Sequence, residues 1–279
     1  MKQESNPPPL QLLGPIDPLG KQAIQRLLDR GRCRSAVYLA HCQSTNTYAL
    51  AEEVAGADLP RLIVTDQQSA GRGRMDRKWY ADVGTLTFSL RMMLDPVHLP
   101  INKQPLLALA GGLAVADVVR HVIAPRQAAI KWPNDVLIDR RKVAGVLVEA
   151  SSEQPRTIVI GIGLNVATDF SQAAAQVANR AVSLHEYTGQ GLNRYALLEP
   201  LMECLQDRID QLASDPEGLL HDFQEGCALT GQAVTLLLRE RAITGIVLGI
   251  DPKGGLRLQT QSGVEIFHAG EVQWQDDAR

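Results

Sequence analysis

The sequence lacks a strong excess of charge of either sign, and it lacks a long uninterrupted apolar run. Its 279 residues carry a formal net charge of −3, so the overall charge does not favour nucleic acid or an anionic membrane as a partner. The longest apolar stretch, 106–119, contains Asp117 and two glycines. It falls short of the roughly 20 apolar residues of a membrane span and predicts a buried helix. The first residues have no apolar run typical of a signal peptide, so we expect a cytoplasmic protein.

Paired cysteines and clustered metal ligands are also missing. The four cysteines form no C-x-x-C pair, and no histidine lies at metal-ligand spacing beside them. We therefore expect free thiols in a reducing compartment and no metal held by the protein alone. The sequence shows no Ser-His-Asp or Cys-His arrangement, so it gives no indication of covalent catalysis.

The most distinctive stretch that is present is a basic loop with the sequence GRGRMDRKW at 71–79. Strand-like apolar runs precede it at 62–65 and follow it at 85–90. Glycine lets backbone N–H groups approach a ligand closely, and arginine can bind phosphate or carboxylate with two donors at once. The loop therefore predicts a site for a small anion. An RNA-binding interpretation of Arg-Gly-Arg is disfavoured by the short run and the acidic net charge.

A polar segment follows the first predicted strand, at 36–40. Ser44, Thr45 and Asn46 stand directly before a predicted helix. They can simply cap that helix, or their hydroxyl and amide groups can face a ligand at the end of the strand. Both interpretations stay open on local grounds.

A lysine in an apolar setting marks a second segment, 129–138. Lys131 stands between Ile130 and Trp132. It is either an edge-strand lysine that faces solvent or a lysine kept there by an anion, since burying an unpaired charge is costly. Pro133 should end this strand because it cannot pair in a ladder.

The remaining elements indicate an α+β protein. We expect a hairpin from 136–138 and 143–149, and a strand at 157–166 whose Gly161 and Gly163 make room for a flat ligand. An amphipathic helix should run from an Asn193 cap to about Leu212. Several short strands are expected after 231. Residues 1–18 should be mobile, and 169–181 should be a lid or a connecting helix.

Five motifs occur in an order that resembles the biotin protein ligase family. They are STN at 44–46, QSAGRGRMDRKW at 68–79, KWPND at 131–135, KVAGVLVE at 142–149 and GIGLNV at 161–166. The basic loop and KWPND are the most specific. The resemblance covers roughly 36–275 and implies a mixed β-sheet with packed helices, similar to class II synthetases, followed by a small SH3-like β-barrel. We divide the chain into an N-terminal extension (1–35), a catalytic domain (36–230) and the barrel (231–279).

The resemblance implies a reaction in two steps. The carboxylate of biotin attacks the α-phosphate of ATP, giving biotinyl-5′-AMP and pyrophosphate. A lysine of a biotin carboxyl carrier protein, a subunit of acetyl-CoA carboxylase, then accepts biotin and AMP leaves. Biotin and ATP are the small-molecule substrates, and Mg²⁺ is expected to arrive with ATP.

The same resemblance implies which residues form the site. Expected contacts to biotin are Ser44, Thr45, Asn46, Gln68, Gly71, Arg72, Gly73, Arg74, Lys131 and Gly145. Expected contacts to ATP or the adenylate are Arg72, Arg74, Trp79, Asn134, Lys142 and Asn165. Catalysis is assigned to Lys131, Arg72 and Arg74, which can offset the repulsion between carboxylate and triphosphate. The base of the second step is not identified; Asp135 is a candidate by position and equally suits a turn.

One residue departs from the family pattern. Family loops usually carry glycine where this chain has Asp76. An aspartate lowers the flexibility of the loop and places an anion among its cations, so closure or affinity could differ.

Two other functions remain as alternatives. A lipoate ligase or octanoyltransferase shares the catalytic fold, but the basic loop together with the C-terminal strands argues against it. A biotin-responsive repressor would need a helix-turn-helix, and the roughly 35 residues before the first predicted strand are few and proline-rich. We therefore expect no operator binding. An edge of the catalytic sheet could pair to give a homodimer.

Overall fold

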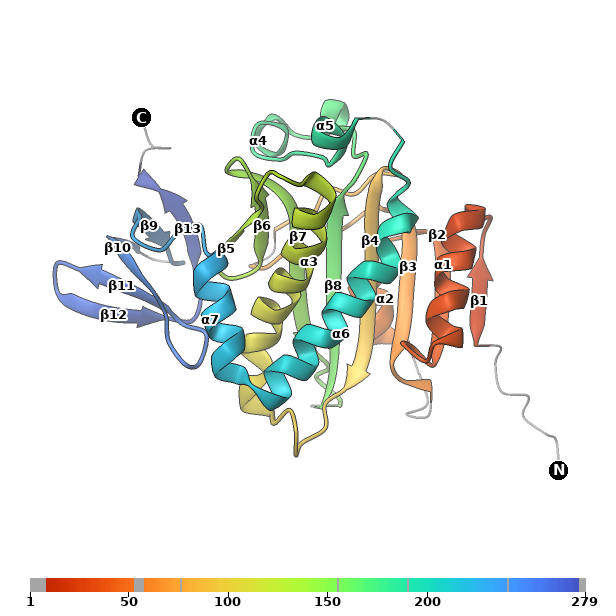
Figure 1. Ribbon diagram of the computed structural model, residues 1–279, viewed down its shortest axis with the longest axis horizontal. Helices are drawn as coiled ribbons and strands as arrows, with labels where there is room; N and C mark the ends of the chain where they lie inside the picture. The colour runs from red at the N-terminus through yellow and green to blue at the C-terminus, as the bar shows by residue number, and fades with distance from the viewer. Residues whose placement is uncertain are drawn as a thin grey trace.

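The computed structural model describes residues 9–52, 58–75, 77–154, 156–189, 191–239 and 241–275. Over these ranges the chain builds an eight-stranded mixed sheet, helices on both of its faces, and a separate five-stranded antiparallel sheet beside it (Figure 1). The predicted α+β class, with a mixed sheet before a small β-domain, is confirmed. Residues 1–8 and Asp76 lie outside the described part.

The large sheet has the strand order β1-β2-β3-β4-β8-β7-β6-β5. The pairs β1–β2 and β2–β3 are parallel, and the pairs that follow are antiparallel. Its strands are β1 (Leu10–Leu13), β2 (Ser35–Cys42), β3 (Arg61–Gln68), β4 (Thr85–Met93), β5 (Ala129–Lys131), β6 (Asp135–Ile138), β7 (Arg141–Ala150) and β8 (Thr157–Asn165). The predicted hairpin is therefore the β6–β7 pair.

Helices cover the two faces of this sheet unequally. The front face in Figure 1 carries α1, α3 and α6, and α2 lies behind the sheet, against β3, β4 and β8. The helices are α1 (Pro18–Asp29), α2 (Thr45–Ala51), α3 (Leu107–Ile123), α4 (Ala175–Ala178), α5 (His185–Thr188), α6 (Leu198–Ser214) and α7 (Pro216–Gly226). Most of the apolar core lies under the front face, and a small cluster around Ala49 lies under α2.

The apolar stretch that was predicted to be a buried helix forms α3, preceded by a 3-10 turn at Ile101–Leu106. The segment 101–123 is long and apolar enough to cross a membrane by composition, but 72% of its most apolar window is buried inside the protein. Gly111 permits this burial, because a Cβ there would stand 2.8 Å from Val146 on β7. α3 is thus the central helix of the core.

The second long helix differs from its prediction at the start. Asn193 does cap a helical segment, but the first turn is a 3-10 helix at Arg194–Leu197, and α6 begins at Leu198. A further helix, α7, was not predicted. Asp215 caps it, Pro216 stands in its first turn, and Leu219 and Phe223 are buried. Two buried side chains gave too weak a periodic pattern to identify it.

The prediction of a mobile N-terminus is wrong for residues 10–13. They form β1, which pairs in parallel with β2 at the edge of the sheet. The Arg61 guanidinium also donates to the Gln11 side chain at 3.1 Å. The segment 169–181 is not a single helix either, since it holds a 3-10 turn at Phe170–Gln172 and the one-turn helix α4.

The C-terminal strands form a sheet in the order β12-β11-β10-β9-β13. They are β9 (Ala233–Leu237), β10 (Ala242–Ile250), β11 (Leu256–Thr260), β12 (Gly263–Phe267) and β13 (Glu271–Trp274). This sheet is attached to the large one through the Trp132 indole, which donates to the Gly254 carbonyl at 2.9 Å, and through the Ala228 amide, which donates to the Ile130 carbonyl at 2.9 Å. It can therefore contribute residues to a shared site. The proposed domain boundaries stay predictions.

Candidate functional site

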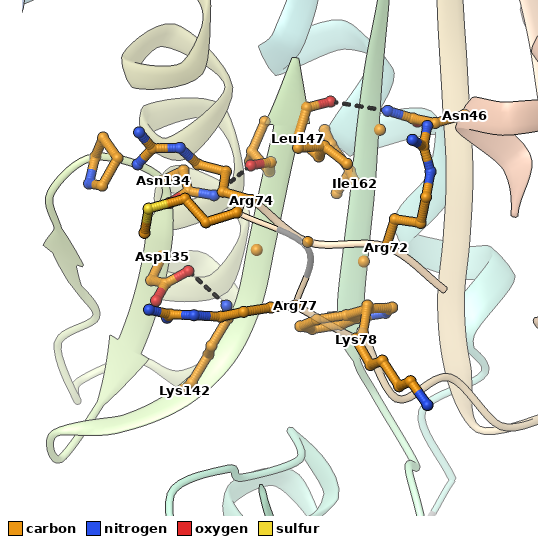
Figure 2. A pocket seen from close by; sticks show the side chains of 18 of the residues that line it. Asn46, Arg72, Arg74, Arg77, Lys78, Asn134, Asp135, Lys142, Leu147 and Ile162 are labelled. Atoms are coloured by element: carbon orange, nitrogen blue, oxygen red, sulfur yellow. Dashed lines mark hydrogen bonds and ion pairs between the residues drawn. The ribbon is translucent and has the colours of Figure 1, made fainter. Parts of the chain in front are cut away.

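A pocket opens where the basic loop crosses the rear face of the large sheet (Figure 2). Its walls come from the loop, the start of α2, the β5–β6 turn, strands β7 and β8, and the β13 end of the small sheet. The predicted site residues that line it are Ser44, Thr45, Asn46, Gln68, Arg72, Gly73, Arg74, Trp79, Lys131, Asn134, Lys142 and Gly145. The structure thus brings together predicted site residues from four of the five motifs.

Strand alternation explains why this face is polar. In β4, Leu86 and Phe88 enter the main core, whereas Thr87 and Ser89 point to the opposite face, where α2 lies. Successive side chains of a strand point to opposite faces of a sheet. The pocket therefore has a floor of hydroxyl groups and glycines on the other side of the apolar core.

The Ser-Thr-Asn segment both caps a helix and faces the pocket. Ser44 is the N-cap of α2 and accepts from the Thr47 amide. The Thr45 amide donates to Gln68 Oε1 at 2.8 Å, and Ser89 Oγ lies 2.7 Å from Thr45 Oγ1 and 2.6 Å from Asn46 Oδ1. A buried, mutually bonded network of this kind holds polar groups in fixed directions. The two interpretations left open for this segment are therefore compatible.

Glu149 connects this network to the basic loop. Asn46 Nδ2 donates to Glu149 Oε2 at 2.9 Å and to the Leu147 carbonyl at 3.2 Å. Arg72 forms an ion pair with the same Glu149 oxygen at 2.6 Å. Figure 2 shows Arg72 extending toward Asn46. Glu149 was not predicted as a site residue, although it stands at the end of a quoted motif.

Two buried polar atoms at the pocket, Thr87 Oγ1 and Trp79 Nε1, have no hydrogen-bond partner among the described residues. Both residues line the pocket, and Thr87 is only 3% exposed. An unsatisfied buried polar group costs about 1–3 kcal/mol, so a ligand that bonded either atom would remove that cost. Thr87 was not predicted as a site residue, because threonine is common in strands and nothing else in the sequence distinguishes it.

The glycines of β8 accommodate the protein's own side chains. A Cβ at Gly161 would overlap the Asn46 amide, and a Cβ at Gly163 would overlap the Trp79 indole. We expected these glycines to make room for a flat ligand; in the structure Asn46 and Trp79 occupy that space. The Trp79 ring also lies 5.3 Å from Lys142 Nζ. The glycines thus let two pocket residues lie flat on the sheet.

The basic loop is closed on itself by backbone hydrogen bonds. The Gly73 amide donates to the Arg77 carbonyl at 2.7 Å, and the Trp79 amide donates to the Gly71 carbonyl at 2.8 Å. Gly71 does not line the pocket; a side chain there would collide with the Trp79 carbonyl. Its glycine is required by this close backbone approach.

Two of the three arginines of the loop, Arg72 and Arg74, point in different directions. Arg72 lies on the Asn46 side of the pocket, and Arg74 lies beside Asn134 (Figure 2). The Arg74 guanidinium stands 5.9 Å from the centre of the Trp132 ring. Burial lowers the pKa of Arg74, partly offset by the charge of Asp135. The loop thus presents one cation to each side of the pocket.

Lys131 ends the edge strand β5, and its side chain lines the pocket. Its ammonium lies 4.7 Å from the centre of the Trp274 ring, on β13 of the small sheet. Burial lowers the pKa of Lys131, and the carboxylates of Asp135 and Glu271 partly offset the effect. A half-buried ammonium without an ion pair within 4 Å among the described residues is well placed to meet an anion.

Two other predicted residues are held by local bonds. Lys142 forms an ion pair with Asp135 at 2.5 Å, as Figure 2 shows, and Asn134 Nδ2 donates to the Val146 carbonyl at 2.5 Å. Asn165 does not line the pocket. Its amide donates to the Lys142 and Val182 carbonyls, at 3.3 and 3.1 Å. Asn165 therefore supports the backbone of Lys142 below the pocket.

Positive charge dominates the described lining. The basic residues are Arg72, Arg74, Arg77, Lys78, Lys131 and Lys142, and the acidic ones are Asp135 and Glu271. Both carboxylates are already paired, Asp135 with Lys142 and Glu271 with Arg77. The pocket can therefore bind more than one anionic group at once, and it can stabilise negative charge that develops during a reaction.

Chemistry at a thiol, or at a metal ion held by the protein alone, depends on the cysteines and on clustered ligand side chains. All four cysteines are free, and burial raises the pKa of each, that of Cys33 to about 12. A thiol with a raised pKa is a poor nucleophile at neutral pH. The described residues contain no group of three or more His, Cys, Asp or Glu side chains arranged to hold a metal ion.

Comparison with known families gives two matches in succession along the chain. Residues 38–165 match the biotin/lipoate A/B protein ligase family, and residues 229–274 match the biotin protein ligase C-terminal domain. The first match contains the pocket residues of the large sheet, and the second contains β13.

Individual relatives agree with these matches. A biotin--[acetyl-CoA-carboxylase] ligase of Mycobacterium tuberculosis is 34% identical over 84% of this chain and 86% of its own. The bifunctional ligase/repressor BirA of Escherichia coli is 30% identical over 97% of this chain and 81% of its own. Among solved structures, a biotin protein ligase from Aquifex aeolicus in complex with biotin and ATP has a TM-score of 0.72 at 27% identity, covering 85% of this chain and 97% of that one.

Proposed function

The chain belongs to the biotin/lipoate A/B protein ligase family, and we propose that it activates biotin with ATP and transfers the biotinyl group to a lysine of a carrier protein. The carrier expected from the relatives is the biotin-accepting subunit of acetyl-CoA carboxylase. The product of the first step is biotinyl-5′-AMP. The second step forms an amide bond and releases AMP.

One observation carries this proposal, namely a pocket with a buried hydrogen-bonding end and a strongly basic end. The Ser44–Asn46 segment and Gln68 form the first end, and the basic loop with Lys131 forms the second. Biotin has a polar ureido ring at one end and a carboxylate at the other. The ureido ring therefore suits the hydrogen-bonding end of the pocket, and the carboxylate suits the basic end.

In the first step the cations bring two anions together. Biotin carboxylate and ATP repel each other, and Arg72, Arg74 and Lys131 offset that repulsion as well as the charge that develops on the transferring phosphorus centre. Lys131 acts as an ammonium rather than as a base in this proposal, since the pocket needs its positive charge. Holding both reactants aligned contributes further.

In the second step the mixed anhydride must survive until the carrier arrives. The basic loop, closed by its own backbone bonds, covers the pocket and limits the access of water. Trp79, Asn134 and Lys142 are assigned to the nucleotide side, and Asn165 supports the backbone of Lys142. Asp135 is ion-paired with Lys142, which favours a positioning role for its carboxylate over the role of base for the carrier amine.

Mg²⁺ is proposed to enter the site as part of the substrate, bound to the ATP phosphates. The carboxylates that line the described pocket, Asp135 and Glu271, are both ion-paired to basic residues. Hard cations such as Mg²⁺ are commonly held by substrate phosphates with one or two carboxylates. Either carboxylate could supply such a contact after exchanging its partner.

Location and assembly are proposals as well. We infer a cytoplasmic enzyme, in keeping with the free thiols. The edge strand β1, with Leu12 and Leu13 exposed, is the element that could pair two chains. Light scattering across a concentration series, with and without biotin and ATP, would report whether a homodimer forms.

The competing function is the ligation of lipoate or the transfer of octanoate to a carrier protein. The C-terminal match and the basic loop favour biotin over lipoate or octanoate. Intact-mass spectrometry of a biotin carrier domain, incubated with the enzyme, ATP and each acid in turn, tests the choice. We expect a mass gain of one biotinyl group with biotin alone. A lipoyl or octanoyl gain, or none with biotin, would contradict the proposal.

Repressor activity is the less favoured alternative. The relatives include bifunctional ligase/repressors. A gel-shift assay with candidate operator DNA, run at increasing salt concentration, tests this alternative. We expect only weak binding that disappears with added salt, because the net charge is negative. Sequence-specific binding that persists in salt would overturn that expectation.

A further inference from the structure

A second cavity lies beside the pocket, between α3, the β5–β6 turn and the small sheet. Its polar lining consists of Arg74, Asn102, Gln104, Lys253 and His268, and its apolar lining includes Leu109 and Val148. Lys253 stands in the turn between β10 and β11, His268 directly follows β12, and Asn102 and Gln104 come from the 3-10 turn before α3. Asn102, Gln104, Lys253 and His268 lie outside the motifs from which the function was proposed.

The charge of this cavity points to an anionic ligand. Its described lining holds two fixed cations, a histidine and two amides, and includes no aspartate or glutamate. By contrast, the described lining of the first pocket includes two carboxylates. Cations and amide donors without a competing carboxylate are the groups that bind phosphate. A lysine side chain of a carrier protein would meet like charge here.

The two cavities meet at Arg74. Its side chain lines both of them, as do Trp132, Pro133 and Val146. Val148 lines only the second cavity and Leu147 lines only the first, as the alternation of β7 requires. The β6 strand pairs with β7 only as far as Gly145. Arg74 of the basic loop lines the second cavity as well as the first.

The direction of the proposed reaction agrees with this arrangement. Biotin is assigned to the Asn46 side of the pocket, where Arg72 lies, and Arg74 lies on the opposite side, beside Asn134 (Figure 2). In transfer at phosphorus the attacking and leaving oxygens stand roughly in line. A carboxylate that attacks from the Asn46 side expels its leaving group toward Arg74, which is the wall of the second cavity.

We propose that the second cavity binds the β- and γ-phosphates of ATP and holds the pyrophosphate that they become. This inference rests on the proposed function. A biotin carboxylate oxygen forms the new bond to the α-phosphorus, and the bond from that phosphorus to the bridging oxygen of the β-phosphate breaks. The bridging oxygen keeps the electron pair and leaves as part of pyrophosphate. Arg74 contacts the departing group, and Lys253, His268, Asn102 and Gln104 receive it.

The test uses the double variant Lys253→Ala/His268→Gln in the full chain. Both side chains are exposed, so the fold should survive, which thermal melting verifies. The matched control is Arg257→Ala, a cation of the same small sheet that is not among the residues lining either cavity. Isothermal titration calorimetry with pyrophosphate measures binding directly, and steady-state assays give KM for ATP and KM for biotin separately.

We expect the double variant to weaken pyrophosphate binding and to raise KM for ATP by about tenfold, the range for two partly exposed charge contacts. KM for biotin and the transfer of biotin from purified biotinyl-AMP should stay unchanged, and Arg257→Ala should behave as the unaltered protein. Pyrophosphate binding that is equal in the unaltered protein and the double variant would overturn the inference. So would an effect confined to KM for the carrier. Pyrophosphate binding that depends on these residues in a protein inactive with biotin would instead refute the proposed function alone.

Discussion

At the scale of single residues, the site holds charged side chains at positions where burial disfavours the charged form. Lys131 is the clearest example, because burial works against its ammonium while Asp135 and Glu271 work for it. The aromatic face of Trp274 adds a further favourable contact. Lys131 thus places a cation at the pocket, and no residue in the described part of the chain forms an ion pair with it that a ligand would have to break.

Removing that cation should affect the first step most. We expect Lys131→Ala to slow biotinyl-AMP formation by about 10- to 100-fold, since a charge-assisted contact is worth roughly 1.5–3 kcal/mol. Rapid-quench measurement of adenylate gives the rate. The control is Lys21→Ala, an exposed lysine of α1. An unchanged rate of adenylate formation in Lys131→Ala would show that this ammonium takes no part.

The pH dependence follows from the lowered pKa of Lys131. Because burial lowers that pKa, the ammonium is lost, and the adenylation rate falls, at a pH below the ordinary value of about 10.4. Asp135→Asn removes a charge that raises the pKa, so it should move this alkaline fall to lower pH. Lys131→Arg should abolish the fall, since arginine stays charged. A fall that moves to higher pH in Asp135→Asn would contradict the assignment.

At the scale of elements, the glycines of α3 test the packing of the core helix. A Cβ at Gly111 would stand 2.8 Å from Val146, whereas a Cβ at Gly112 would stand 3.5 Å from Ile130, an ordinary contact. Alanine is favoured over glycine inside a helix by roughly 0.5–1 kcal/mol.

We therefore expect Gly112→Ala to raise the melting temperature by about 1–4 °C, the shift that roughly 0.5–1 kcal/mol gives in a chain of this size. Gly111→Ala should lower it, because Val146 or the helix must move. Differential scanning calorimetry gives both melting temperatures, and each variant serves as the control for the other. Equal shifts would mean that α3 does not approach β7 as closely as described.

The elements that local chemistry determines are those that the sequence predicted well. Ser44 caps α2, Pro133 stands just after the end of β5, and the strands of the small sheet fall between turn residues as expected. β1 was missed because its four residues pair with β2 rather than showing a pattern of their own. The 3-10 start of α6 was missed because a capping residue does not distinguish the two helix types.

The site was predictable only where its residues stand in the quoted motifs. The pairs Arg72–Glu149 and Arg77–Glu271 join residues 77 and 194 positions apart. Thr87 became recognisable only because the folded pocket leaves its hydroxyl without a partner. Such contacts depend on which strands become neighbours, and no local propensity reports that. The outcome for Asp76 lies outside the described residues.

At the scale of the whole molecule, the small sheet is part of the site. β13 supplies Glu271 to the Arg77 side chain of the basic loop and Trp274 to Lys131. The Trp132–Gly254 hydrogen bond fixes the two sheets beside each other at this point. The loop is therefore supported from two sides, by the large sheet and by β13.

A double-mutant cycle measures that support. The Arg77–Glu271 pair is partly exposed, so its loss should cost at most about 1 kcal/mol of stability. Release of biotinyl-AMP should nevertheless become severalfold faster in Arg77→Ala and in Glu271→Gln, because the loop loses its attachment to β13. The double variant should release it no faster than either single variant, as monitored by stopped-flow fluorescence. Effects that add would mean that the two residues act separately.

The central claim is that the basic pocket activates biotin by joining its carboxylate to the α-phosphate of ATP. Exchange of labelled pyrophosphate into ATP, measured with biotin, lipoate and octanoate in parallel, tests it most directly. The account predicts exchange that requires biotin and falls by 10-fold or more in Lys131→Ala. Exchange that proceeds equally well with lipoate, or that is absent with biotin, would contradict it.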